Sequence, residues 1–180
     1  TIANECGFGP PVVSIQGNGS RCSGLLVHPE IVLYAQHCPT SGVTRVEFTH
    51  DIGDGHFEYV EYCTPYPGSW SVAQDWAYCK LQEPYYGIPV IPAAYGCELD
   101  DYLNVNQFVT LCGFGAYDIP ENQDGRKRFG EGRISGVGSG GIDVGPYNGV
   151  TACPGDSGGP LLVQIADGSW RTLGITSVYN

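Results

Sequence analysis

The sequence has no methionine, few basic side chains and no long apolar run. Its 180 residues include 8 Lys and Arg against 19 Asp and Glu, a formal net charge of −11. Binding of nucleic acid requires a basic surface, so this balance argues against a nucleic-acid partner. A membrane-spanning helix needs about 20 consecutive apolar residues, and the apolar stretches here are far shorter. We therefore expect neither a nucleic-acid nor a membrane partner.

Charged residues make up only 15% of the chain, which contains 27 glycines and 13 prolines. This composition excludes a coiled coil and a helical bundle, and it favours short strands joined by turns. No window of 12 or more residues holds a 3.6-residue apolar period, so we predict an all-β fold. The expected strands are Val12–Ile15, Ser23–Val27, Ile31–Ala35, Val43–Thr49, Phe57–Cys63, Trp76–Leu81, Phe108–Leu111, Leu161–Ile165 and Thr172–Val178.

Eight cysteines in a chain of this length indicate an oxidising compartment, because disulfides persist outside the cell. The chain starts at Thr1 without an apolar leader, which fits a processed, secreted, extracellular product. Cys22 and Cys38 flank a predicted hairpin and could close it.

The segment Glu83–Cys97 carries three prolines and two glycines, which is typical of a connection between two halves. We therefore divide the chain into residues 1–90 and 91–180. The glycine-rich stretch Gly130–Gly149 is interpreted as surface loops around short strands. Asn18-Gly19-Ser20 fits an N-glycosylation pattern, but a tight Asn-Gly turn is the favoured interpretation.

A candidate nucleophile lies in the segment TACPGDSGGPLL, residues 151–162. Ser157 stands among small residues, as a nucleophile must if a substrate carbonyl is to approach it closely. The backbone N–H groups of Gly155 and Ser157 could form an oxyanion hole. The alternative is a glycine-rich turn between two strands.

The order of residues along the chain decides between types of serine hydrolase. The segment satisfies G-x-S-x-G, but an α/β-hydrolase needs a histidine after the serine, and none follows Ser157. The order Asp, His, Ser fails for His37, because the first aspartate is Asp51. The order His, Asp, Ser remains.

His37 is the best candidate base, since an apolar strand leads into it and Cys38 follows it. The other histidines, His28, His50 and His56, lie in polar, turn-like settings and are interpreted as structural or surface residues. Asp75 directly precedes the predicted strand Trp76–Leu81. A carboxylate that leads into a buried strand needs a partner, such as an imidazole N–H.

Four segments together resemble the chymotrypsin/trypsin family of serine proteases. They are CSGLLV and QHC around His37, DWAYCKL after Asp75, Gly113-Phe114-Gly115, and GDSGGPL around Ser157, and they occur in the family's order. The resemblance implies two antiparallel six-stranded Greek-key barrels with the site between them. It also implies that Ser157 is the nucleophile, His37 the general base and Asp75 the group that orients His37.

The same resemblance assigns further residues. Ser177 would lie beside Asp75, and a strand at Ser177–Tyr179 would pair with an extended polypeptide substrate. Thr151 would form the base of the specificity pocket, and Val178 and Tyr179 its wall. Because Thr151 carries no charge, we expect cleavage after small or modest uncharged residues.

The chain departs from the family at both ends. Its start, Thr1-Ile2-Ala3-Asn4, differs from the usual Ile-Val-Gly-Gly. Either the Thr1 amine pairs with Asp156, or the site forms without zymogen cleavage. The family continues beyond the position of Asn180, so we expect an incomplete C-terminal barrel. A second chain that completes this barrel is favoured over a truncated, inactive protein.

Disulfide pairs other than Cys22–Cys38 stay open. Cys63 with Cys79 would bracket the Asp75 loop, Cys6 with Cys97 would tie the N-terminus to the second half, and Cys112 could pair with Cys153. Alternatively, Cys153 could bond to an absent C-terminal piece.

No metal or cofactor is expected. Asp51, Asp54 and Glu58 could hold Ca²⁺, but their spacing does not match an EF-hand, so a solvated turn is favoured. The sequence also lacks the H-E-x-x-H zinc motif. Two functions remain, namely a secreted serine endopeptidase and a catalytically silent binding or regulatory protein with the protease fold. The first is preferred, because all three candidate catalytic residues are present.

Overall fold

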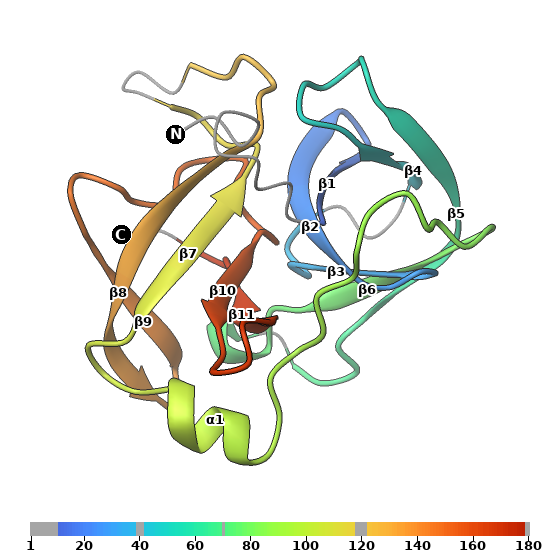
Figure 1. The fold of residues 1–180 in the computed structure, drawn as a ribbon. Coiled ribbons are helices and arrows are strands. Elements are labelled where there is room, and N and C mark those ends of the chain that lie inside the picture. The colour runs from blue at the N-terminus through green and yellow to red at the C-terminus, as the bar shows by residue number, and fades with distance from the viewer. Residues whose placement is uncertain (1–10, 39–41, 70, 118–121, 179–180) are drawn as a thin grey trace.

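The structure is a computed structural model that describes residues 11–38, 42–69, 71–117 and 122–178. The predicted all-β fold is confirmed, since strands dominate the chain and two β structures lie side by side (Figure 1). The first is a closed barrel and the second an open sheet. This arrangement agrees with the predicted pair of barrels, the second of which is incomplete.

Six antiparallel strands close the N-terminal barrel. They are β1 (Val12–Gly17), β2 (Ser20–His28), β3 (Ile31–Tyr34), β4 (Val43–Phe48), β5 (His56–Pro65) and β6 (Ala77–Leu81), paired in the order β1-β2-β3-β6-β5-β4. Alternating side chains such as Ile15, Val32 and Val46 fill the interior. Closure leaves this half without a free strand edge.

A two-residue turn at Asn18-Gly19 joins β1 to β2. The φ angles of these residues are 49° and 78°, and Gly17 pairs with Ser20 across the turn. Two successive positive φ values are typical of the tight hairpin turn that Asn-Gly favours. Asn18-Gly19 therefore forms the tight turn that was the favoured interpretation of this motif.

Strand β2 is buried on both faces from Cys22 to Leu26. Leu26 points into the barrel core, whereas Leu25 joins Cys112, Phe114 and Leu162 in a second cluster. A strand covered on both sides has a continuous apolar run in place of alternation. β2 is thus the barrel strand on which the second half packs.

The second half forms a five-stranded antiparallel sheet. Its strands are β7 (Phe108–Gly113), β8 (Arg128–Gly138), β9 (Gly141–Pro146), β10 (Pro160–Gln164) and β11 (Trp170–Ile175), in the order β11-β10-β7-β8-β9. Val109, Ile134 and Leu161 form its core.

The interpretation of Gly130–Gly149 as surface loops around short strands is wrong for most of the segment, because β8 and β9 make a long hairpin there. The glycines of β8 leave room for side chains from neighbouring segments. A Cβ at Gly130 would lie 2.5 Å from Val150, and one at Gly132 would lie 2.6 Å from Val144. Packing of valines over glycines stabilises strands whose own residues have low β-propensity.

In the part of the chain that the structure describes, two short helical elements were not predicted, namely α1 (Cys97–Tyr102) and a 3₁₀ turn at Val72–Gln74. Six and three residues are too few to produce a detectable helical period. Among the described residues, neither helical element, nor any other, has the length and apolar character needed to cross a membrane.

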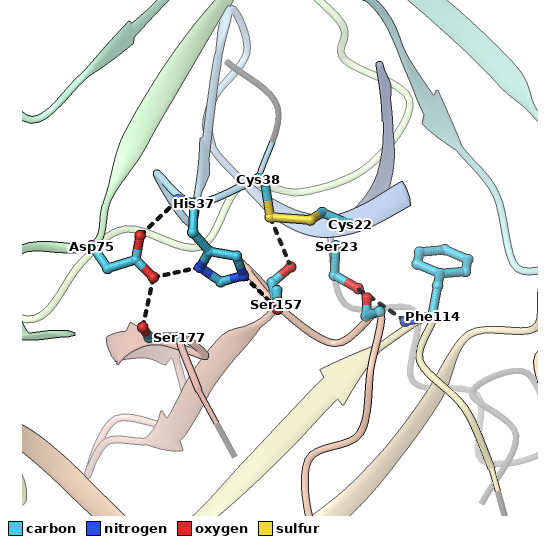
Figure 2. The surroundings of a disulfide bond; sticks show 9 residues. Cys22, Ser23, His37, Cys38, Asp75, Phe114, Ser157 and Ser177 are labelled. Carbon is cyan, nitrogen blue, oxygen red and sulfur yellow. Dashed lines mark hydrogen bonds and ion pairs between the residues drawn. A yellow bond between two sulfur atoms is a disulfide. The ribbon is translucent and has the colours of Figure 1, made fainter. Parts of the chain in front are cut away.

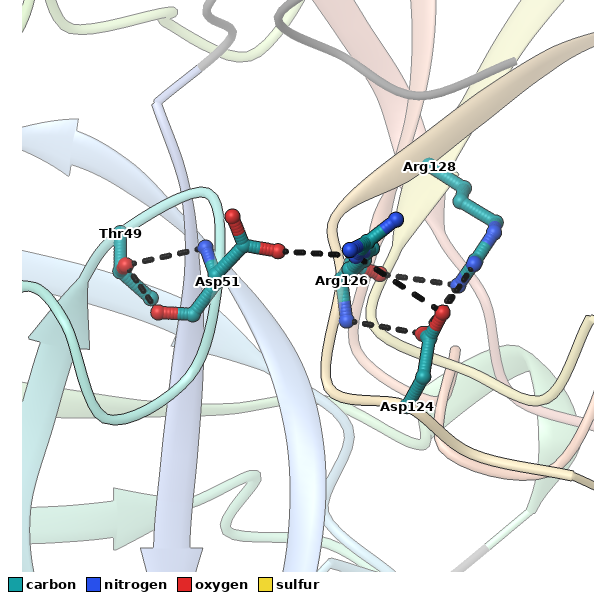
Figure 3. Close-up of polar contacts among 5 residues, drawn as sticks. All are labelled: Thr49, Asp51, Asp124, Arg126 and Arg128. Atoms are coloured by element: carbon teal, nitrogen blue, oxygen red, sulfur yellow. Dashed lines mark hydrogen bonds and ion pairs between the residues drawn. The ribbon is translucent and has the colours of Figure 1, made fainter.

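The two halves also make backbone contacts at the turn after β4. The Ile52 N–H donates to the Gly125 carbonyl, and the Lys127 N–H donates to the His50 carbonyl. Beside them the Asp51 carboxylate lies 3.4 Å from the Arg126 guanidinium (Figure 3). This junction joins the barrel to the segment that leads into β8. The division of the chain at residue 90 stays a prediction.

Candidate active site

The structure brings three distant residues together at the junction of the two halves (Figure 2). His37 precedes Asp75 by 38 residues and Ser157 by 120. Its Nδ1 lies 2.6 Å from Asp75 Oδ2, and its Nε2 lies 2.9 Å from Ser157 Oγ. The imidazole therefore bridges a carboxylate and an alcohol.

Strand pairing places His37 beside Asp75. β3 and β6 are antiparallel neighbours, with Tyr34 opposite Ala77. His37 follows the end of β3 and Asp75 precedes the start of β6, so both residues leave the barrel at the same edge. The predicted disulfide Cys22–Cys38 is present and fastens the residue after His37 to β2.

Asp75 is buried, and its carboxylate accepts several hydrogen bonds. The His37 N–H donates to Oδ1 at 2.8 Å, and the Ser177 hydroxyl donates to Oδ2 at 2.5 Å. Burial alone would raise the pKa of Asp75, but the hydrogen bonds from Ser177 and His37 outweigh it and lower that pKa. Asp75 is therefore an ionised acceptor.

This charge determines where the proton on His37 resides. An ionised carboxylate can only accept, so Nδ1 of His37 must carry the proton that points at Asp75. In the neutral ring Nε2 is then unprotonated and accepts from the Ser157 hydroxyl. The arrangement can remove a proton from Ser157.

Two glycines after Ser157 allow its loop to pack closely against both halves. A Cβ at Gly158, whose φ is +82°, would lie 2.3 Å from the Ser23 carbonyl oxygen. A Cβ at Gly159 would lie 2.3 Å from the Cys112 carbonyl oxygen. Any other residue at these positions would push Ser157 away from His37.

Two backbone N–H groups, those of Gly155 and Ser157, are the predicted donors of an oxyanion hole. Within the described part of the chain, the N–H groups of Gly155 and Ser157 donate to no protein acceptor. The carbonyl of Pro154 accepts from the Ala116 N–H at 2.9 Å, so the Gly155 N–H of the same trans peptide points the opposite way. These donors are available to an oxyanion.

Asp156 is directed away from Ser157 into the second half. Its carboxylate accepts the N–H groups of Gly115 at 2.9 Å and Cys153 at 3.0 Å. Burial raises the pKa of Asp156 above its ordinary value, and those two donors oppose the rise. Thr1 lies outside the described residues, so its pairing with Asp156 stays a prediction.

The specificity residues are placed only in part. β11 ends at Ile175, so the predicted strand through Val178 is too long, because the ladder to β10 stops where Ile175 meets Pro160. Val178 is exposed, Thr151 is exposed in the loop before Cys153, and Tyr179 lies outside the described residues.

The cysteines divide into paired and unpaired residues. Cys63–Cys79 is present and joins β5 to β6. The suggested Cys112–Cys153 bond is absent, and Cys112 is a buried thiol whose pKa burial raises to about 12. Cys97 is an exposed thiol, and its suggested partner Cys6 lies outside the described residues.

Two of the three acids suggested for Ca²⁺ have other partners. Asp51 pairs with Arg126, and Glu58 lies 2.5 Å from His56 Nε2. Across residues 11–178, apart from the short stretches that the structure does not describe, no three His, Cys, Asp or Glu side chains gather as metal ligands would.

Comparison with protein-family models shows a match over nearly the whole chain. No curated protein matches the chain. The profile of the family described as Trypsin matches residues 4–180, nearly the whole sequence. Together with the closed barrel, the second sheet and the order of the motifs, this match establishes the family. The chain belongs to the trypsin family.

Proposed function

We propose that this protein is an extracellular serine endopeptidase that hydrolyses polypeptides through an acyl-enzyme intermediate. The observation that carries the proposal is the alignment of Asp75, His37 and Ser157, with heavy-atom distances of 2.6 and 2.9 Å. These are hydrogen-bond distances, so proton transfer needs no rearrangement.

In the first half-reaction, Ser157 Oγ attacks the peptide carbonyl carbon while His37 Nε2 takes the hydroxyl proton. The carbonyl oxygen becomes an oxyanion that accepts hydrogen bonds from the N–H groups of Gly155 and Ser157. Asp75 stabilises the imidazolium without taking its proton. The C–N bond then breaks, and His37 gives its proton to the departing amine.

In the second half-reaction a water molecule replaces the amine. His37 takes a proton from the water as its oxygen attacks the ester carbonyl, and the same two N–H groups stabilise the second oxyanion. The C–O bond to Ser157 breaks, and the proton returns from His37 to Ser157 Oγ. The enzyme regains its starting state, and the substrate leaves as a carboxylic acid.

The preference for small or modest uncharged residues before the cleaved bond rests on Thr151, which supplies no countercharge for Lys or Arg. Ser177 and Val178 are proposed to line the substrate's backbone. The extracellular location rests on the two disulfides, which persist in oxidising compartments. A second chain that completes the C-terminal half stays a prediction.

Active-site labelling tests the proposal. A fluorophosphonate should phosphonylate Ser157, and peptide mapping by mass spectrometry should locate the adduct there. Ser157→Ala should abolish both labelling and peptide hydrolysis while the thermal unfolding midpoint stays near that of the wild type.

The matched control is Ser135→Ala, since this serine lies on β8, away from the candidate site, and its hydroxyl donates to the Asp143 carbonyl at 3.2 Å. That variant should label and cleave normally. A folded wild-type protein that resists the reagent would favour the silent binding protein. Activity that survives Ser157→Ala would refute Ser157 as the nucleophile.

A further inference from the structure

Ser23 is a polar residue at the centre of the junction between the halves. It is completely buried on β2, next to Cys22. Its hydroxyl oxygen accepts the Phe114 N–H at 2.9 Å, and its O–H donates to the Gly155 carbonyl at 2.9 Å (Figure 2). One hydroxyl thus joins the barrel to two segments of the second half.

The Gly155 carbonyl belongs to the peptide between the two proposed oxyanion donors. The N–H group of Gly155 precedes this peptide, and that of Ser157 follows it. The other end of the same peptide, the Asp156 N–H, donates to the Cys153 carbonyl at 3.0 Å. Ser23 therefore holds the carbonyl end of this peptide, whose orientation determines the directions of both donor N–H groups.

The neighbouring peptides are held through their carbonyls as well. The Pro154 carbonyl accepts from Ala116, and the Asp156 carbonyl accepts from the Gly159 N–H at 2.8 Å. The Gly155 carbonyl, in contrast, accepts its hydrogen bond from a side chain, that of Ser23. Gly155 also has a φ of +97°, in a region that glycine enters and leaves easily. Removal of the Ser23 hydroxyl would release this central carbonyl.

The main chain of Ser23 contributes a further contact. Its N–H donates to the Ser157 carbonyl at 2.9 Å, a bond that no side-chain substitution removes. The position of Ser157 and the orientation of the Gly155–Asp156 peptide are thus fixed by different atoms of one residue. Their effects on catalysis can be separated by mutation.

We propose that Ser23 is a positioning residue that orients the oxyanion hole through the Gly155 carbonyl. The inference rests on the proposed function, because it assigns Gly155 and Ser157 the role of oxyanion donors. Removal of one donor typically lowers kcat by about 10²- to 10³-fold. Ser23 acts through the donors, so loss of its hydroxyl should lower kcat by about 10- to 100-fold.

The test compares Ser23→Ala with the wild type for peptide hydrolysis and for inhibition by a peptide boronic acid. The boronate forms a tetrahedral adduct with Ser157 and places an oxygen in the oxyanion hole. We expect kcat to fall with KM within about twofold, and boronate affinity to fall by the same factor as kcat/KM. A merely structural defect would lower the amount of active enzyme, measured by titration with fluorophosphonate, and leave the boronate affinity of that enzyme unchanged.

The matched control is Ser14→Ala, on the strand position directly opposite Ser23. Ser14 is equally buried, but its hydroxyl has no hydrogen-bond partner among the described residues. This variant should keep wild-type kcat and boronate affinity. Should Ser23→Ala fail to fold, Ser23→Gly removes the same hydroxyl with less steric demand.

The outcomes separate the two proposals. Wild-type kcat and boronate affinity in a folded, hydroxyl-free variant would overturn the role of Ser23 and leave the protease intact. Failure of the wild type to label at Ser157 would overturn the proposed function itself.

Discussion

At the scale of single residues, the proposed chemistry depends on one buried carboxylate. Asp75 has a side chain with no solvent exposure, against 35% exposure for His37. The buried charge is tolerated because three donors from His37 and Ser177 reach its two oxygens. Loss of its charge should therefore act mainly on the proton position of His37.

Asp75→Asn tests this dependence. The amide NH₂ would donate to Nδ1 and force the His37 proton onto Nε2, where it blocks removal of the Ser157 proton. We expect kcat to fall by a factor on the order of 10⁴, with KM little changed. Steady-state kinetics near neutral pH measures the effect.

Asp54→Asn is the matched control, since Asp54 is exposed on the turn after β4 and should tolerate the change. A decrease of less than tenfold in kcat for Asp75→Asn would contradict the proposed role of Asp75.

Asp75 and His37 could be predicted from the sequence because each adjoins an apolar strand. A carboxylate beside a buried strand needs a hydrogen-bond partner, and a general base must be held in a fixed position. Ser23 could not be predicted as a site residue, because in the sequence it is one small residue within the apolar run CSGLLV. The role of Ser23 arises from Phe114 and Gly155, which lie 91 and 132 residues away. Such partners become visible only when the halves are packed together.

At the scale of elements, two disulfides brace the barrel in different places. Cys22–Cys38 and Cys63–Cys79 have the same sequence separation of 16 residues. Loss of either should therefore destabilise the fold by a similar amount, about 3 kcal/mol in the chain-entropy account. Only the first adjoins His37, so their effects on catalysis should differ.

The double variants Cys22→Ala/Cys38→Ala and Cys63→Ala/Cys79→Ala form a matched pair. We expect comparable losses of unfolding free energy in urea titrations. The first variant should also lose about tenfold or more in kcat at temperatures where it stays folded, because His37 is less well oriented. Equal kcat in both variants would contradict a positioning role for Cys22–Cys38.

The β8–β9 hairpin could not be predicted from the sequence pattern. Most strands were predicted to within a few residues from β-branched and aromatic runs. β8 contains the sequence RFGEGRISGVG, whose glycines lower its own β-propensity. Its strand structure depends on Val144 and Val150, which a single-sequence pattern does not connect to it.

At the scale of the whole molecule, charged residues reinforce the junction between the halves. Asp51 of the barrel lies beside Arg126, and Asp124 accepts from both terminal nitrogens of Arg128 at 2.7 and 2.6 Å (Figure 3). The hydrogen bonds from Arg128 lower the pKa of Asp124 to about 2. Acid should weaken this part of the structure.

The sign of the pH effect follows from that shift. The pKa of Asp124 is lower in the folded protein than its ordinary value of 3.8. Its contribution to stability is therefore complete above about pH 4 and is lost as the pH falls towards about 2. The wild type should exceed Asp124→Asn in unfolding free energy at pH 5 to 7, and the difference should shrink between about pH 4 and 2.

Urea unfolding across this pH range measures the difference, with Asp54→Asn as the control that should show no such trend. A constant gap between wild type and Asp124→Asn at every pH would contradict the linkage.

The double-barrel architecture was expected because several motifs occur in the order of one family. An incomplete second barrel was also expected, and the second half is an open sheet of five strands. The packing of β2 against both halves was not expected, because burial of its second face depends on docking of the second sheet. The sequence predicts which segments meet, whereas the hydrogen bonds between them require the structure.

The separation of the reactive groups has a consequence for the newly made chain. His37 and Asp75 belong to the barrel, which is synthesised first, and Ser157 belongs to the sheet that follows. In the proposed mechanism, a nascent chain whose barrel has folded carries the base His37 but lacks the Ser157 hydroxyl that His37 would activate. We therefore expect such a chain to be unable to hydrolyse neighbouring proteins until the second half has been made.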